Sequence, residues 1–184
     1  ATGSSAAAVT ATAVTPQPFR VDYSVVNGGS VSPTFANYDL GTPVVFPLPT
    51  RTGYTFAGWS TAATGGTVIG LNGASYSPTG NVTVYATWTG IAYPITYNSN
   101  GGTNTVPTSG SYTTGGSAYP IAAAPGGMTK SGYNFAGWNT LSTGLGSDFA
   151  VGANYETSAA LTLFAKWNAI VFTVTYQNSG SGSG

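Results

Sequence analysis

Residues 53–59 read Gly-Tyr-Thr-Phe-Ala-Gly-Trp, and residues 132–138 read Gly-Tyr-Asn-Phe-Ala-Gly-Trp. Trp59 and Trp138 therefore lie 79 residues apart, and the same offset separates Trp88 from Trp167. A fixed period of this length is typical of tandem modules. The sequence predicts two copies of one folded unit, and the rest of the chain is interpreted around them.

The signature also predicts a local irregularity in its strand. Tyr54 and Phe56 alternate to one face of an extended segment, whereas Trp59 falls on the opposite face. One extra residue in a β-bulge at Ala57-Gly58 returns Trp59 to the face of the other two rings, and glycine tolerates the backbone of such a bulge. We expect the tyrosine, phenylalanine and tryptophan of each copy to share one core.

Further strands are predicted before and after the signature. Residues 19–26 and 91–97 open the two copies, and the double glycines Gly28-Gly29 and Gly101-Gly102 that follow them predict tight hairpin turns. In residues 82–88 and 161–167, apolar side chains alternate with polar or aromatic ones, which is typical of a sheet with one wet face. Tyr85 and Phe164 fall on the outward face and are candidates for a contact surface.

The predicted boundaries follow from the repeat. Residues 1–18 form an extended N-terminal arm or linker, 19–90 form module 1, 91–169 form module 2, and 170–184 hold one further strand and a Gly/Ser tail. That C-terminal strand presents four apolar side chains on one face: Ile170, Phe172, Val174 and Tyr176. Such a strand folds back on module 2, opens a further module, or inserts into a neighbouring chain.

Composition excludes several classes of partner. Only 4% of the 184 residues are charged, and Lys plus Arg number 4, so no basic surface is available for nucleic acid. No apolar run approaches the ~20 residues that span a bilayer, so membrane insertion is not expected. A neutral polar surface suits secreted and surface-attached proteins.

Catalytic and metal-binding residues are scarce. The chain has no His and no Cys, which removes the commonest general base and a strong nucleophile. Asp148 and Glu156 resemble a glycosidase pair in type, but neither has a counterpart in module 1. An isopeptide bond from Lys130 or Lys166 to an Asn or Asp is a further alternative, although Thr87 replaces Lys166 in module 1. We expect no catalytic residue, no metal site and no cofactor.

Three segments together resemble a known family. They are the two signatures, Leu-Thr-Leu-Phe-Ala-Lys-Trp at 161–167, and Ile-Thr-Tyr-Asn-Ser-Asn-Gly-Gly at 95–102. The pattern resembles the Listeria–Bacteroides repeat, also called the internalin B-repeat type. The resemblance implies a mainly β protein made of two tandem, small β-grasp-like modules plus the C-terminal strand. It also implies arrays in secreted or wall-attached bacterial proteins, without catalytic residues.

Three functions remain open at this point. The first is a non-enzymatic structural or adhesive segment, a stalk or spacer, of an extracellular or cell-surface bacterial protein. The second is a subunit of an extracellular filament that exchanges strands with other copies of itself or with neighbouring repeats. The third is a carbohydrate-binding module, whose partner is a glycan; a host or cell-surface protein is the other external partner considered.

Overall fold

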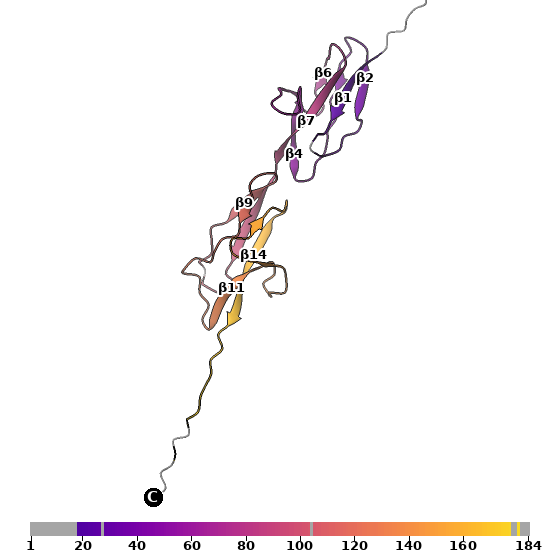
Figure 1. Ribbon diagram of the computed structural model, residues 1–184. Helices are drawn as coiled ribbons and strands as arrows, with labels where there is room; N and C mark the ends of the chain where they lie inside the picture. Colours follow the sequence, from indigo (N-terminus) through magenta and orange to yellow (C-terminus); the bar gives the residue numbers. More distant parts are fainter. Residues whose placement is uncertain (1–17, 27, 104, 178–179, 181–184) are drawn as a thin grey trace, which may run out of the picture. The chain divides into compact units, whose positions relative to one another are not determined.

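The computed structural model describes residues 18–26, 28–103, 105–177 and 180 (Figure 1). The arm or linker expected at 1–18 lies outside the described residues except for Pro18, as does most of the Gly/Ser tail. The chain divides into two compact units, with the boundary between Thr89 and Gly90. We call them unit 1 and unit 2 and describe each by itself.

Each unit contains a five-stranded sheet and a separate two-stranded sheet. In unit 1 the strand order is β2-β1-β7-β4-β5, with β3 paired to β6. The bounds are β1 (Phe19–Ser24), β2 (Phe35–Tyr38), β3 (Val44–Val45), β4 (Tyr54–Ser60), β5 (Val68–Gly70), β6 (Ser75–Tyr76) and β7 (Val82–Gly90).

Unit 2 repeats this arrangement strand for strand. Its order is β9-β8-β14-β11-β12, with β10 paired to β13. The bounds are β8 (Ala92–Asn98), β9 (Gly110–Thr113), β10 (Tyr119–Pro120), β11 (Tyr133–Asn139), β12 (Asp148–Phe149), β13 (Asn154–Tyr155) and β14 (Leu161–Ala169). No helix occurs among the described residues, so the expectation of a mainly β fold is confirmed.

The first and last strands of each unit are parallel neighbours. β1 runs alongside β7 with Val21 opposite Val82 and Tyr23 opposite Val84, and the two strands lie side by side in Figure 1. β8 runs alongside β14 in the same way, from the pair Ile95–Leu161 to the pair Phe164–Asn98. Antiparallel pairing joins other strands of each sheet, for example β1 with β2 and β8 with β9. The two chain ends of a unit therefore lead into the centre of its sheet.

The bulge expected in the signature is present in unit 2. Along β11 the partners change from Phe135–Trp167 to Trp138–Ala165. Between these two pairs, β11 therefore has two residues and β14 has one. The extra residue falls at Ala136-Gly137, and Gly137 has a φ of 113°. In unit 1 the equivalent Gly58 has a φ of 137°. The bulge turns each signature tryptophan inward.

Both signature tryptophans are fully buried. Trp59 and Trp138 each have 0% of their surface exposed. The indole Nε1 of Trp59 donates to the Pro47 carbonyl at 2.9 Å, and that of Trp138 donates to the Ala122 carbonyl at 2.8 Å. Aromatic rings surround each indole, since Tyr97 lies 4.8 Å from Trp138 between ring centroids. The ring burial and the satisfied N–H groups show that these residues form the two cores.

The signature tyrosines do not join the cores, contrary to expectation. Tyr54 is half-buried and Tyr133 is 40% exposed. Tyr133 pairs with Ala169 at the far end of the β11–β14 ladder, beyond the packed centre of the sheet. A cation covers each ring instead: the Arg51 guanidinium lies 3.7 Å from the Tyr54 centroid and the Lys130 amine 4.7 Å from the Tyr133 centroid.

The strand expected at 170–176 does not form within this chain. The Ile170 amide donates to the Gly132 carbonyl at 2.8 Å, and after it the segment has no ladder partner among the described residues. Phe172 is 77% exposed and Tyr176 is 91% exposed. Extended chain counts as a strand only when a neighbour supplies hydrogen bonds, and unit 2 does not offer one here. The folding-back alternative is therefore not observed.

The two bulge glycines provide a matched test of local packing. A Cβ on Gly58 would lie 2.5 Å from Val68 Cγ1, whereas the nearest atom to a Cβ on Gly137 is the Phe149 oxygen at 3.4 Å. Both alanine variants are strained by a positive φ, but only Gly58→Ala also overpacks its neighbour. We expect Gly58→Ala to lower the free energy of unfolding by about 1–2 kcal/mol more than Gly137→Ala, measured by urea denaturation. Equal losses would contradict the packing argument.

Candidate functional site

Each unit has a corner at which a double-glycine loop packs on the second tryptophan. In unit 1 the glycines lie in the long connection between β1 and β2, at residues 25–34, and not in the tight hairpin that the sequence suggested. A Cβ on Gly29 would lie 2.7 Å from the Thr50 oxygen and 3.1 Å from Trp88 Cζ2. Only glycine fits here, because the loop lies close to both the Thr50 backbone and the Trp88 indole.

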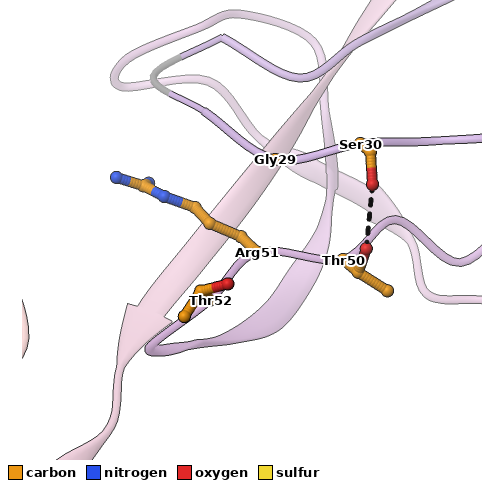
Figure 2. Close-up of a pocket in the computed structure, with 5 residues that line it drawn as sticks. All are labelled: Gly29, Ser30, Thr50, Arg51 and Thr52. Atoms are coloured by element: carbon orange, nitrogen blue, oxygen red, sulfur yellow. Dashed lines mark hydrogen bonds between the residues drawn. The ribbon is translucent and has the colours of Figure 1, made fainter. Parts of the chain in front are cut away.

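Hydrogen bonds fix this corner in unit 1. Ser30 and Thr50 exchange two backbone hydrogen bonds of 2.8 Å, and their hydroxyl oxygens lie 3.0 Å apart (Figure 2). A hollow of about 610 Å³ opens beside them, lined by Gly29, Ser30, Thr50, Arg51 and Thr52. In Figure 2 the Arg51 side chain extends away from the Ser30–Thr50 bridge. The corner thus presents one cation and three hydroxyl groups.

The corner of unit 2 uses equivalent residues. A Cβ on Gly102 would lie 2.6 Å from Trp167 Cζ2 and 3.0 Å from the Thr129 oxygen, and the Thr103 amide donates to that oxygen at 2.7 Å. The Trp167 indole donates to the Ser99 carbonyl at 2.9 Å. A hollow of about 250 Å³ is lined by Asn100, Lys130, Tyr133, Ser142, Thr143, Gly144, Lys166 and Trp167.

Sequence reasoning singles out Lys130 only for an isopeptide bond, and it misses the equivalence of Lys130 with Arg51. Arg51 and Lys130 keep the 79-residue offset of the signature and would have been found by extending the alignment two residues upstream. Each lies over the signature tyrosine of its own unit. The stacked cation shields the exposed face of that ring, which is a structural role shared by both units.

The candidate contact residues lie at equivalent places on the outer faces of the two sheets. Tyr85 is half-buried opposite Ser24, and Phe164 is half-buried opposite Asn98 and Asn139. Their neighbours Val84 and Leu163 are fully buried, which confirms the alternation along β7 and β14. The assignment of Tyr85 and Phe164 to a contact surface stays a prediction, as does that of Ile170, Phe172, Val174 and Tyr176 to an intermolecular strand.

Two of the four acidic residues form salt bridges. Asp22 forms a salt bridge with Arg20 at 2.5 Å, and Asp148 forms one with Lys166 at 2.5 Å. Asn139, which is 1% exposed, donates to the second carboxylate oxygen of Asp148 at 2.6 Å. The Lys166 and Asp148 side chains are 35% and 58% exposed, so this contact is a solvated ion pair. Among the described residues, no three acidic side chains gather in a way that could hold a metal ion.

The partners of Asp148 favour its ionised form. Hydrogen bonds from Lys166 and then Asn139 hold the pKa of the Asp148 carboxyl below its usual value. A lowered folded-state pKa means that the associated stability is present above the ordinary aspartate pKa and is lost as the pH falls through the lowered one. We expect Lys166→Met to raise the pKa of Asp148 toward the ordinary range, measured by NMR titration of the carboxyl carbon. An unchanged midpoint in the variant would show that Lys166 does not determine it.

Comparison with known proteins reveals related sequences. The profile of the Listeria-Bacteroides repeat domain matches residues 19–87 and again 93–166. Internalin H of Listeria monocytogenes is 32% identical over 156 residues, which cover 82% of this chain and 26% of that protein. A protein of Evansella cellulosilytica, provisionally named a Gly-rich membrane protein, is 30% identical over 155 residues, which cover 71% of this chain and 16% of that protein.

These relatives are much longer than the matched region. The chain spans about a quarter or less of their length. No solved structure matches the chain. No helix with the length and hydropathy needed to traverse a lipid bilayer occurs among the described residues.

Proposed function

The chain belongs to the Listeria-Bacteroides repeat domain family, and on that premise we propose that it is a non-enzymatic structural segment of an extracellular or cell-surface bacterial protein. In this role it acts as a stalk or spacer that separates other parts of the protein. A surface location is supported by the family and by relatives that are named as an internalin and a membrane protein. We also assign the units to a β-grasp-like type, supported by the central parallel pair of first and last strands.

One observation carries the spacer role. Two units of the same topology follow each other with a single residue, Ile91, between the last strand of one and the first strand of the next. Each unit has its own aromatic core, and the two cores share no residue. The chain is thus a series of units that fold by themselves, whereas a flexible linker gains reach only as the square root of its residue number.

A surface-display experiment tests this role. The chain is placed between a wall anchor and a short N-terminal epitope on a bacterial cell, and antibody binding to the epitope is measured. We expect stronger binding than with a Gly/Ser linker of 184 residues in the same place. Equal binding would show that the folded units contribute no reach. Adhesion of the epitope-free strain to host cells or purified glycans separates an adhesive role from a purely structural one.

A specific observation favours strand exchange as a second candidate function. Residues 170–176 align with the first strand of unit 2, yet their apolar side chains are exposed, with Val171 at 89%, Phe172 at 77% and Val174 at 69%. An unpaired apolar strand supplies both the ladder and the side chains needed to join another sheet. Other copies of this chain, or neighbouring repeats, are the partners that this arrangement fits.

Oligomer size against concentration tests strand exchange. Aspartate at Phe172 would place a charge on the face predicted to enter the neighbour's core, whereas aspartate at Val171 would place it on the other face. We expect concentration-dependent assembly by light scattering that Phe172→Asp abolishes and Val171→Asp retains. A strictly monomeric chain at all concentrations would exclude this function.

Tyr85 and Phe164 provide the contact surface for the adhesive and glycan-binding alternatives. Aromatic side chains on a wet sheet face stack on sugar rings or pack against a partner protein. We expect any binding on a glycan array to be lost in a Tyr85→Ala, Phe164→Ala double variant that keeps its tryptophan fluorescence. Binding that survives the double substitution would assign the contact to another surface.

A further inference from the structure

The position of the terminal strands determines how each unit responds to a pull on its chain ends. β1 and β7 are parallel neighbours, so tension draws β1 toward its own start and β7 toward its own end. These directions are opposite and lie along one axis. The two strands would therefore have to slide past each other before the sheet could open.

Sliding loads all the hydrogen bonds between the two strands together. The ladder joins four residue pairs in unit 1, from Val21–Val82 to Ser24–Tyr85, and four in unit 2, from Leu161–Ile95 to Phe164–Asn98. The bonds of a parallel ladder are evenly spaced along the two strands, so sliding strains all of them at once and no bond breaks until the load exceeds the strength of the set. Two strands pulled apart from one end would instead break these bonds one at a time.

Side chains resist the same movement. Val21 and Val84 of unit 1 are fully buried, and so are Ile95 and Leu163 of unit 2, so sliding would drag apolar groups out of a packed core. On the outer face of unit 2 the Thr96 and Thr162 hydroxyl oxygens lie 3.1 Å apart and bridge the two loaded strands. In unit 1 the Arg20 amide donates to the Asn81 side chain just before β7, at 2.8 Å.

We propose that each unit is a force-bearing element, in which the parallel pair of first and last strands carries tension along the chain in shear. Because a single residue separates β7 from β8, tension on the β1–β7 pair is transmitted through the backbone to the β8–β14 pair. This inference rests on the proposed structural role and extends it, because a spacer needs only length whereas a force-bearing element must also resist unfolding under load. The physiological load in this proposal is tension between the bacterial cell and the partner to which the surface protein is bound.

Single-molecule pulling on the full chain tests the proposal directly. The chain contains no cysteine, so two introduced cysteines give unique attachment points. One stays constant at Pro18→Cys, just before β1. The second is Thr89→Cys, at the far end of β7, or Thr79→Cys, just before its start. All three positions are exposed. The first combination pulls β1 and β7 in shear, and the second peels them apart from one end.

We expect the shear combination to rupture at a force about threefold higher than the peeling combination at the same loading rate, because four ladder pairs share the load. The released length must match the number of residues between the two attachment points, which confirms that unit 1 unfolded. Matching thermal unfolding of the two double-cysteine proteins confirms that the cysteines did not alter stability.

Equal rupture forces in the two combinations would overturn the force-bearing proposal. That result would leave the spacer role intact, because reach in the display experiment is measured without load. Conversely, a failed display experiment with a high shear force would remove the spacer role alone. A lower force in shear than in peeling would show that another part of the unit yields first, and would also overturn the proposal.

Discussion

Trp138→Ala is expected to unfold unit 2 while unit 1 stays folded. Trp138 is completely buried, packs on Tyr97 and Phe135, and donates its indole N–H to the Ala122 carbonyl. Removing a buried tryptophan costs about 3–5 kcal/mol. A single-core domain of this size has only roughly 4–10 kcal/mol of stability in total, so the loss consumes much or all of it.

The measurement uses the duplication as its own control. Amide NMR spectra report the two units separately, and Trp138→Ala should collapse the dispersion of unit 2 resonances alone. Trp59→Ala should do the reverse, because Trp59 is buried in the equivalent core with its indole bonded to Pro47. Loss of both sets of resonances in either variant would show that the units are not independent folding units.

Inserting one alanine after Ala136 is expected to destabilise unit 2 about as much as losing Trp138 itself. The bulge sets two residues of β11, Ala136 and Gly137, against one of β14, and it brings Phe135 and Trp138 to the same face. A second extra residue reverses the side-chain parity of the strand beyond Phe135, so Trp138 points to solvent unless the whole ladder shifts. The expected cost is at least ~3 kcal/mol, from the exposed indole and the empty core.

A substitution at the same position is the matched control. Ala136 is exposed, so Ala136→Ser changes the side chain without changing the residue count and should alter stability by no more than about 0.5 kcal/mol. Urea unfolding of unit 2, followed by its own resonances, measures both variants. An insertion that is tolerated as well as the serine variant would mean that the bulge does not set the register.

The features that sequence reasoning found are those with a short-range signal. The alternation along β7 and β14 has a period of two, so the burial of Val84 and Leu163 could be read directly. The bulge at Ala136-Gly137 could be inferred because Trp138 has the wrong parity for a regular strand. Repetition strengthened both inferences, since each pattern occurs twice.

The features that were missed depend on distant parts of the chain. Nothing local indicates that β1 pairs with β7 in parallel, because the pairing residues are about sixty positions apart in the sequence. Tyr54 and Tyr133 share the parity of Phe56 and Phe135, yet they lie beyond the packed centre of the sheet, which parity alone does not reveal. The sequence pattern at 170–176 is typical of a strand, but a strand also needs a neighbouring strand to which its backbone can hydrogen-bond.

The single residue between β7 and β8 also bears on how proteins of this kind change in length. Because the end of one unit is immediately the beginning of the next, any segment of one full period starts and stops at the same structural position. Recombination can therefore add or remove such a segment at almost any breakpoint and restore complete units on both sides. Copy number can then vary freely while every unit keeps its own interior.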